Sequence, residues 1–310
     1  VIGKIANGIA DDMLTTTVMA CPCKKLIAPA MNTRMFENPI LQDNLEKCRH
    51  YGMDIIMPDS GRLACGDVGS GKLPSEEVLV AAILKEIRYE KDMQGLKVLV
   101  TAGATQEAID PVRFISNHST GKMGFALAKT AMQRGADVTV VAAHTSAKEP
   151  LYVNIRRVSS AADMFEACKE EAKTADIIIK AAAVADYTPV ETADNKIKKS
   201  DDTMAITCKR TQDILAYLGA HKPDGQFLCG FSMETEHMLE NSEKKLEKKN
   251  LDMIVANNLK VKGAGFATDT NVVTLITKEE VKELPLMSKD EVANEILTQI
   301  LQRRCPENGQ

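Results

Sequence analysis

The sequence has no tryptophan, and aromatic residues make up only 4% of its 310 positions. It contains no run of 18 apolar residues, the minimum for a membrane-spanning helix, and it does not open with a signal-peptide pattern. It also lacks a basic excess, because the net charge is -4 at pH 7. These absences argue against a nucleic-acid or anionic-membrane surface. They predict a cytoplasmic protein with neither a membrane nor a nucleic-acid partner.

Eight cysteines are present, but their spacing suits neither a disulfide framework nor a zinc site. Cys21 and Cys23 form a short pair, yet no second pair follows at the spacing of zinc ligands. We therefore expect free thiols in a reducing compartment. The apolar content of 44% is sufficient for one large core or for two domains in a chain of this length.

Apolar β-branched runs alternate with helical patterns along most of the chain. The sequence predicts buried strands at 24–32 and 54–58, and a helix at 75–90 that is capped by Ser75. The stretch KDMQG (91–95) interrupts the pattern, and a fresh series then begins. We expect its strands at 96–103, 136–143, 175–187, 227–235 and 252–258, and its helices at 122–134 and 161–172. Such alternation predicts a parallel sheet covered by helices on both faces.

The C-terminal part follows a different pattern. Two apolar runs at 271–277 and 281–287 are separated by a short charged turn and predict a hairpin. The sequence SKDE (288–291) is a capping box that opens a final amphipathic helix. The predicted organisation is a partial first domain at 1–90, a linker at 91–95, and a complete α/β domain with a Rossmann-like parallel sheet, C-terminal hairpin and helix at 96–310.

The stretch RFISNHSTGKMG (113–124) resembles a phosphate loop without being one. A Walker loop needs a glycine five positions before the Gly-Lys pair and a Ser or Thr directly after it. Ser116 and Met123 occupy those two positions. The preceding stretch VTAGATQEAIDPVR (100–113) also lacks the Gly-x-Gly-x-x-Gly pattern of a dinucleotide fold. We expect the 113–124 loop, which leads into a helix N-terminus, to hold an anionic or carbonyl-bearing group instead.

Three other stretches together suggest a nucleoside triphosphate. In AAAVADY (181–187), small residues would let a flat ligand approach the backbone, and Asp186 could accept ribose hydroxyls. Lys196 lies in KIKK (196–199), and Lys245 and Lys249 lie four apart on one predicted helical face. Taken singly, Asp186 is equally well explained as a turn aspartate, and the lysines are better explained as solvated surface charge. Taken together, one carboxylate for the sugar and three ammonium groups suit a triphosphate.

Residues 96–303 resemble the phosphopantothenate–cysteine ligase domain of the bacterial bifunctional coenzyme A biosynthesis flavoproteins. The resemblance rests on a series of motifs that occur in the same order in this family. These motifs are TAGATQEAIDPVRFISNHSTGKMG, AAAVADY, KIKK, GFSMET, KKLEKKNLDMIVAN and GFATDTN. The implied activity joins 4′-phosphopantothenate to cysteine, with CTP as the activating nucleotide and Mg²⁺ as the expected metal.

The first domain is similar to the C-terminal part of the family's FMN-dependent phosphopantothenoylcysteine decarboxylase, a flavodoxin-like fold. IGKIANGIADDMLTTT (2–17), PAMN (29–32) and GRLACGDVGSGKL (61–73) match its flavin, substrate-clamp and active-site cysteine motifs. The resemblance implies that Cys65 returns a proton to the product and that Asn32 binds the substrate carboxylate. The chain opens without Met in what reads as the middle of a helix, so we expect a missing N-terminal segment, weak or no FMN retention and no decarboxylation.

The resemblance also implies roles for individual residues of the ligase domain. Asn117 would bind the pantothenoyl acyl group and its cytidylate, and Arg113 would position the loop or assist the second half-reaction. The remaining implied nucleotide contacts are Ala182, Asp186, Lys196, Thr211, Gln212, Asp213, Phe231, Lys245 and Lys249. The family more often has proline where Gln212 stands, which affects the shape of that turn. No metal ligands are assigned.

Two classes of function remain open at this point. The first is a CTP-dependent ligase, with homo-oligomers built from ligase-domain dimers. The second is a nucleotide- or flavin-binding regulatory fragment without catalysis. The presence of both a triphosphate clamp and a separate acyl-side loop favours the enzyme.

Overall fold

The computed structural model describes residues 1–63, 66–198, 203–233, 238–257 and 268–304. The chain divides into two compact units, unit 1 (Val1–Glu90) and unit 2 (Lys91–Gln310). Residues 91–95, predicted as a linker, pack onto unit 2, where Met93 is fully buried. The Met93 amide donates to the Arg134 carbonyl over 3.0 Å. None of the described helices is long and apolar enough to cross a membrane.

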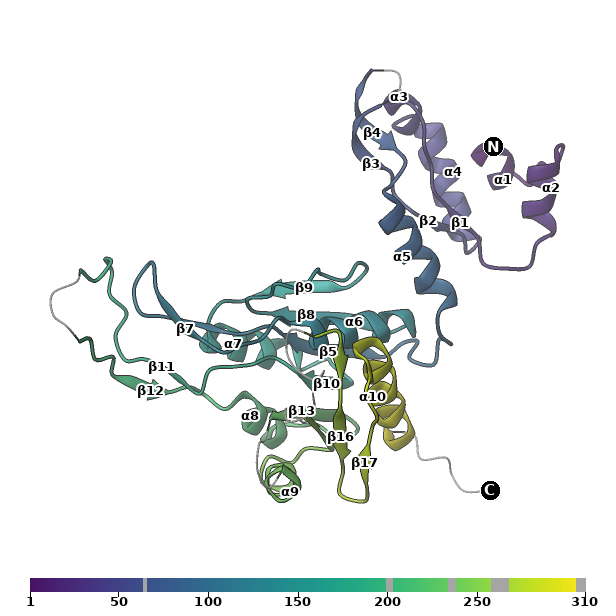
Figure 1. Ribbon diagram of the computed structural model, residues 1–310. Coiled ribbons are helices and arrows are strands. Elements are labelled where there is room, and N and C mark those ends of the chain that lie inside the picture. Colours follow the sequence, from purple (N-terminus) through teal and green to yellow (C-terminus); the bar gives the residue numbers. More distant parts are fainter. Residues whose placement is uncertain (64–65, 199–202, 234–237, 258–267, 305–310) are drawn as a thin grey trace. The chain divides into compact units, whose positions relative to one another are not determined.

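Unit 1 combines short helices with two small strand pairs (Figure 1). β1 (Leu26–Ile27) pairs in parallel with β2 (Asp54–Ile55), and β3 (Asp59–Arg62) pairs antiparallel with β4 (Val68–Lys72). The buried strands predicted at 24–32 and 54–58 are therefore much shorter, and they are half-buried. Pro29 and Pro58 follow the paired residues closely and have no N–H to extend the ladder. The helices are α1 (Ile2–Ala6), α2 (Met13–Ala20), α3 (Thr33–Phe36), α4 (Pro39–His50) and α5 (Glu76–Ile87), the last capped by Ser75 as predicted.

Unit 2 is built on an eight-stranded sheet with the order β17-β16-β14-β13-β10-β5-β8-β9. The six strands from β14 to β9 are parallel, and β16 and β17 are antiparallel to their neighbours. When the six parallel strands are numbered in chain order, their order across the sheet is 3-2-1-4-5-6, as in a doubly wound dinucleotide fold. The Rossmann-like prediction is therefore confirmed. The strands are β5 (Lys97–Ala102), β8 (Asp137–Ala142), β9 (Asn154–Arg157), β10 (Ile177–Lys180), β13 (Phe227–Met233), β14 (Met253–Asn257), β16 (Val273–Ile276) and β17 (Val281–Glu283).

Helices cover both faces of this sheet, as the alternation of strands and helices predicts. α6 (Lys122–Gln133) and α10 (Lys289–Arg304) pack on one face, where their buried side chains join Val100 and Ile179 in one core. α7 (Ala161–Glu171), α8 (Ile214–Ala220) and α9 (Met238–Lys248) pack on the other, where the core includes Leu99 and Ile178. Consecutive strand residues thus enter opposite cores, which is the period of two that β-structure imposes.

The C-terminal prediction also holds. β16 and β17 form the expected hairpin at 271–287, and α10 begins directly after Ser288. The Ser288 amide donates to Glu291 Oε2 over 2.8 Å, and the Glu291 amide donates back to the Ser288 hydroxyl over 3.3 Å. These two bonds form the capping box that the sequence indicates.

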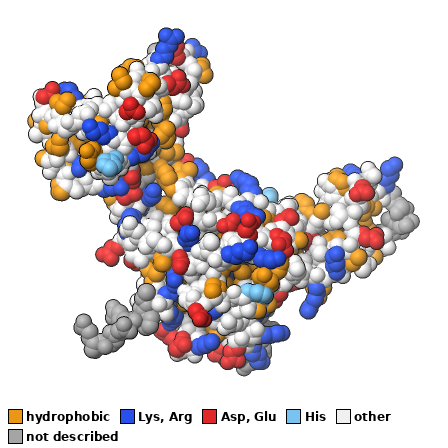
Figure 2. Space-filling view, turned by 180° about the vertical axis from the view of Figure 1, so that it is seen from behind, with side chains coloured by type: hydrophobic (Ala, Val, Ile, Leu, Met, Phe, Trp, Pro, Cys, Tyr) orange, Lys and Arg blue, Asp and Glu red, His pale blue; other side chains and the backbone are white. Residues whose placement is uncertain are grey.

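Two short ribbons extend from the carboxyl edge of the sheet as an arm (Figure 1). One pairs β6 (Gln106–Ala108) with β7 (Phe114–Ser116), and the other pairs β11 (Tyr187–Pro189) with β12 (Cys208–Arg210). The Ala193 amide joins the ribbons by donating to the Ile109 carbonyl over 3.0 Å. Figure 2 shows hydrophobic side chains among the charged ones on this arm. A further pair, β15 (Thr270–Asn271) with β18 (Met287–Ser288), lies beside α10.

Candidate nucleotide and substrate pocket

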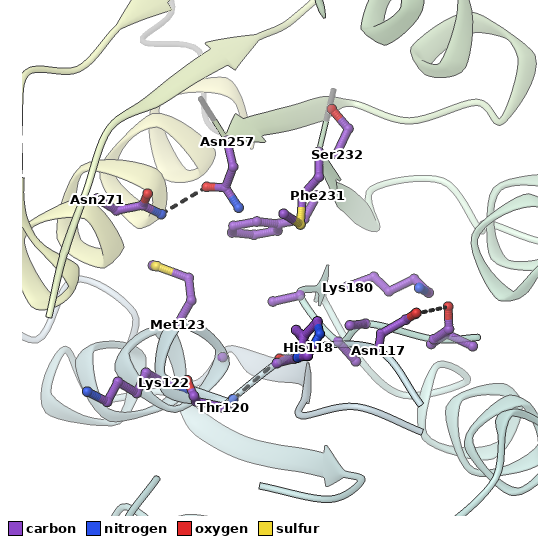
Figure 3. A pocket seen from close by; sticks show the side chains of 18 of the residues that line it. Asn117, His118, Thr120, Lys122, Met123, Lys180, Phe231, Ser232, Asn257 and Asn271 are labelled. Carbon is purple, nitrogen blue, oxygen red and sulfur yellow. Dashed lines mark hydrogen bonds between the residues drawn. The ribbon is translucent and has the colours of Figure 1, made fainter. Parts of the chain in front are cut away.

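A pocket of about 450 Å³ lies at the carboxyl ends of β10, β13 and β14, against the N-terminus of α6 (Figure 3). The strand order reverses between β5 and β10, so the two following loops diverge at this edge. Open parallel sheets bind ligands in the crevice that such a reversal creates. The loop 117–121 and the residues 181–184 and 186 adjoin in the lining.

Two glycines allow α6 to begin so close to the strand ends. A Cβ on Gly124 would lie 2.7 Å from the Ala102 Cβ, and a Cβ on Gly103 would lie 2.4 Å from the His144 carbonyl oxygen. Gly103 also has φ +83°, a left-handed conformation that other residues rarely adopt. Any side chain at these positions would therefore push the helix or the loop away from the sheet.

Buried threonines fix the segment that follows β10. The amides of Ala182 and Ala185 donate to the hydroxyls of Thr101 and Thr105, each over 3.0 Å. The Thr211 hydroxyl donates to the Ala185 carbonyl over 2.7 Å. The backbone of 182–185 is thus held in one conformation, and its small side chains leave the pocket side open.

The charges around the pocket are mainly positive. Lys122, Lys180, Lys245 and Lys289 line it, and Asp186 is the acidic residue among the lining side chains that the structure describes. Lys122 forms an ion pair with Asp269 over 2.7 Å. Lys289 is 7% exposed, and its pKa is lowered by burial and by the nearby Lys122. A concave site with this surplus of ammonium groups favours a multiply charged anion.

The structure brings five of the predicted site residues into the pocket lining: Asn117, Ala182, Asp186, Phe231 and Lys245. In Figure 3, Phe231 and Met123 reach into the space between α6 and the ends of β13 and β14. The Asn117 carboxamide donates to the Val184 carbonyl over 3.3 Å, a long hydrogen bond that a ligand could replace. The other predicted residues of unit 2 lie outside the lining: Arg113, Lys196, Thr211, Gln212, Asp213 and Lys249.

Lys249 and Asp213 form an ion pair over 2.7 Å between α9 and α8. Asp213 also caps α8 by accepting from the Ala216 amide over 3.0 Å. Burial opposes ionisation of Asp213, but the hydrogen bonds from Lys249 and the helix backbone outweigh it and lower the pKa of this carboxyl. Both predicted nucleotide contacts are therefore engaged with each other in this structure.

Arg113 stabilises the arm. Its guanidinium donates to Asp110 Oδ2 through Nε over 2.9 Å, and its Nη2 donates to the Ile197 carbonyl over 2.8 Å. The Arg113 guanidinium holds the pKa of the fully buried Asp110 carboxyl well below its usual range. Asp110 also accepts from the Ile197 amide over 3.2 Å. The Arg113–Asp110 pair thus anchors the exposed loop that carries Lys196.

Sequence reasoning missed several lining residues, above all Lys180, Asn257 and Asn271. Asn271 is 4% exposed, and its carboxamide donates to Asn257 Oδ1 over 2.9 Å, as the dashed line in Figure 3 shows. Asn257 ends β14 and Asn271 belongs to β15. Both lie within motifs that carry the resemblance, but only the strand order shows that they meet at the pocket.

The described residues bring together no group of three or more His, Cys, Asp or Glu side chains that could hold a metal ion. Magnesium prefers six oxygen ligands and commonly binds through phosphates and water with few protein ligands.

In unit 1, the hairpin of β3 and β4 packs against the segment that contains Asn32. The Met31 amide donates to the Gly71 carbonyl over 2.9 Å, and a Cβ on Gly71 would lie 2.2 Å from the Met31 carbonyl oxygen. The Asn32 carboxamide donates to Asp67 Oδ2 over 2.8 Å. Asp67 is two residues from Cys65, which lies outside the described residues. The substrate-clamp and cysteine motifs therefore adjoin.

Three residues of the predicted flavin motif (2–17) and two that follow it line a shallow hollow in unit 1. Its lining is Met13, Thr16, Thr17, Ala20 and Cys21, and its volume is about 520 Å³. Hydroxyl groups beside apolar side chains suit a flat ring system with polar edges. The residues present are therefore compatible with a flavin.

Comparison with known proteins covers both units. The family of the DNA/pantothenate metabolism flavoprotein C-terminal domain matches residues 93–303, and the flavoprotein family matches residues 1–88. The coenzyme A biosynthesis bifunctional protein CoaBC of Bacillus subtilis is 48% identical over 97% of this chain and 75% of its own length. A cysteine/cysteine sulfinic acid decarboxylase from an unknown prokaryotic organism is 44% identical over 97% of this chain and 85% of its own length.

A solved structure of the C-terminal domain of a CoaBC protein matches unit 2. It is 44% identical, has a TM-score of 0.60, and covers 69% of this chain and 98% of its own. Three findings therefore point to the same family: the two matching family models, the sequence identity over nearly the whole chain, and the shared fold of unit 2. This chain belongs to the family of bifunctional coenzyme A biosynthesis proteins, with a flavoprotein-family unit followed by a unit of the pantothenate metabolism flavoprotein C-terminal family.

Proposed function

We propose that unit 2 ligates 4′-phosphopantothenate to cysteine with CTP as the activating nucleotide. One observation carries this proposal: among the described residues, four lysines and one aspartate line a pocket at the strand-order reversal of a Rossmann-like sheet. The family membership supports the substrates, since relatives named CoaBC act in coenzyme A biosynthesis. The positive pocket supports a triphosphate rather than a neutral ligand.

In the first half-reaction, a carboxylate oxygen of phosphopantothenate attacks the α-phosphorus of CTP. The bond from that phosphorus to the bridging oxygen breaks, and pyrophosphate leaves with its electron pair. The products are an acyl-cytidylate and pyrophosphate. Lys245, with Lys196 and Lys249 if they close on the nucleotide, would offset the charge that develops on the phosphates. Asp186 would accept hydrogen bonds from the ribose, and Phe231 would flank the base or sugar.

In the second half-reaction, the cysteine amine attacks the acyl carbon and CMP leaves. The amine must lose a proton, and the CMP phosphate retains the former carboxylate oxygen. Asn117 would hold the acyl oxygen during both steps, because its carboxamide faces the pocket beside the fixed backbone at Ala182. The carboxamide would then exchange its long bond to the Val184 carbonyl for one to the intermediate.

Pyrophosphate release in the presence of phosphopantothenate tests the proposal. Each of the four nucleoside triphosphates is supplied in turn, with and without cysteine. We expect release with CTP that requires phosphopantothenate, and amide product only when cysteine is added. Equal rates with ATP would contradict the choice of nucleotide. Carbon dioxide release from cysteine without any pyrophosphate would favour the activity for which one relative is named.

We also infer that two copies of unit 2 pair through the arm. Val112, Phe114, Tyr187 and Val190 lie on it with between 46% and 59% of their surface exposed. Exposed apolar groups that cluster on one projection mark an interaction surface. Asp110 and Arg113 hold this projection in shape, so a second copy would meet a preformed surface.

For unit 1, we propose a role in decarboxylating the ligase product with FMN, which replaces the expectation of weak FMN retention and no decarboxylation; the match of residues 1–88 to the flavoprotein family supports it. The flavin would supply reversible two-electron redox chemistry: electrons taken from the substrate thiol would allow CO₂ to leave and would then return to the product with a proton. Thr16 and Thr17 would hold the flavin, and Asn32 would bind the substrate carboxylate. The contact of Asn32 with Asp67 supports this assignment, since it brings the two substrate motifs together. Flavin absorbance of the purified protein, and CO₂ release from phosphopantothenoylcysteine, are the corresponding tests.

A further inference from the structure

Lys180 is a pocket residue to which neither the motifs nor the family resemblance gives a role. It ends β10, and its register partners are Thr101 of β5 and Gly230 of β13. It therefore lies at the centre of the carboxyl edge, beside the strand-order reversal. It is half-buried and lines the pocket (Figure 3). Ile178, two residues earlier, enters the core beneath α7, α8 and α9, so Lys180 faces the same side.

The titratable groups around Lys180 come from three helices. Lys245 and Lys249 approach from the α9 side, Asp213 from the start of α8, and Cys168 from α7. Asp213 is already paired with Lys249. Burial raises the pKa of the Cys168 thiol to about 12, so this group is neutral. Asp186 and His118 line the same pocket.

Lys180 has no carboxylate partner within the described ranges of the chain. No ion pair or hydrogen bond of its ammonium group occurs there, whereas Lys122 and Lys249 each have an aspartate. Burial lowers the pKa of Lys180 to about 8; Lys249 and Lys245 also lower it, while Asp213 opposes them. A half-buried lysine without a counter-ion destabilises the empty protein, and residues of this kind concentrate at binding and catalytic sites.

We propose that Lys180 is a further phosphate-binding residue of the nucleotide site, whose side chain takes up a proton from solvent when the triphosphate binds in alkaline solution. This inference rests on the proposed function. It adds one phosphate-binding residue to the nucleotide site and couples nucleotide binding to the uptake of a proton. The triphosphate supplies the negative charge that the surroundings of Lys180 lack. Nucleotide binding and protonation of Lys180 must then favour each other.

The direction of the pH effect follows from the two states of the lysine. In the free protein its pKa is about 8, and a bound anion raises that pKa. Below pH 7 the lysine is protonated in both states, so binding takes up no proton. Above pH 8 the free protein has lost the proton and binding restores it, so affinity falls as the pH rises. The phosphates of the nucleotide do not titrate there, because their second pKa is near 6.

Calorimetric titration with CTP at pH 7.0 and 8.5, each in two buffers of different ionisation enthalpy, tests the proposal. For the unchanged protein we expect proton uptake at pH 8.5 and none at pH 7.0. Lys180→Met should weaken CTP binding about 10- to 100-fold at pH 7.0, the range for losing one charge-assisted hydrogen bond, and should abolish the uptake. Lys180→Arg should bind CTP at both pH values without taking up a proton, because arginine stays charged.

Lys244→Met is the matched control, because Lys244 is exposed on α9 and lies outside the pocket. It removes the same charge and should keep both the affinity and the proton uptake. Circular dichroism of Lys180→Met shows whether the variant is folded, and Lys180→Arg tests the proposal independently of that. CTP binding and proton uptake by Lys180→Met equal to those of the unchanged protein would overturn this inference and leave the proposed function standing. Failure of the unchanged protein to bind CTP would overturn both.

Discussion

Lys249 and Asp213 lie 2.7 Å apart, although each of them is predicted to contact the nucleotide. Their side chains are 19% and 50% exposed, so solvent screens the pair. A pair of this exposure contributes about 0.2–1 kcal/mol. It therefore positions α9 against α8 more than it stabilises the fold, and Lys249 can exchange Asp213 for a phosphate at small cost.

A double-mutant cycle with Asp213→Asn and Lys249→Met measures this pair. Asparagine still caps α8, so the cycle isolates the charge. We expect a coupling of about 0.5 kcal/mol in the free energy of unfolding at pH 7. Because the folded pKa of Asp213 is lowered, the contribution is fully present above its unfolded pKa, near 4, and is lost as the pH falls through the lower folded value. A coupling that vanishes between pH 7 and 5 would contradict the assignment.

Asn117→Asp should separate the two half-reactions. Aspartate keeps the shape of the side chain but places a negative charge where the carboxamide would meet the acyl intermediate. We expect acyl-cytidylate to form with CTP and phosphopantothenate and to convert slowly when cysteine is added, as rapid quench measurements would show. Equal loss of both half-reactions in a folded variant would contradict the proposal that Asn117 contacts the acyl group of the intermediate.

Lys196→Gln should slow cytidylate formation while leaving folding unchanged. If Lys196 contacts the triphosphate in the reacting complex, its removal should cost about 2–4 kcal/mol of transition-state stabilisation, or about 30- to 900-fold in rate. Lys173→Gln removes a comparable exposed charge outside the pocket lining and serves as the control. Because Lys196 lies in the exposed arm loop, unchanged pyrophosphate release in the variant would show that it is a solvated surface lysine.

Phe114→Glu should weaken pairing through the arm. Phe114 is 51% exposed on β7, and a buried carboxylate without a partner would disfavour a contact with a second copy. We expect a lower molar mass by sedimentation equilibrium. Val281→Glu changes a residue of similar exposure on β17, away from the arm, and should leave the mass unchanged. Identical masses for Phe114→Glu and the unchanged protein would exclude the arm as the interface.

Much of unit 2 could be predicted because its elements carry local signals. The apolar runs of β5, β8 and β10 and the Ser288 capping box each specify structure within a few residues. The arm ribbons were not predicted, because strands of three residues show no alternation. Lys180 was overlooked because it stands inside an apolar run, and its exposure to a pocket depends on which strands adjoin β10. The meeting of Asn257 with Asn271 and of Lys249 with Asp213 likewise required the strand order.

The central claim is that phosphopantothenate is activated as an acyl-cytidylate. The fate of its carboxylate oxygen tests this claim most directly. Phosphopantothenate labelled with oxygen-18 in its carboxylate is converted with CTP and cysteine, and the phosphorus-containing products are analysed by mass spectrometry. Attack on the α-phosphorus predicts one labelled oxygen in CMP and none in pyrophosphate, because the C–O bond breaks when the amine displaces CMP. Label in orthophosphate with CDP as the nucleotide product, or CMP without label, would contradict the acyl-cytidylate mechanism.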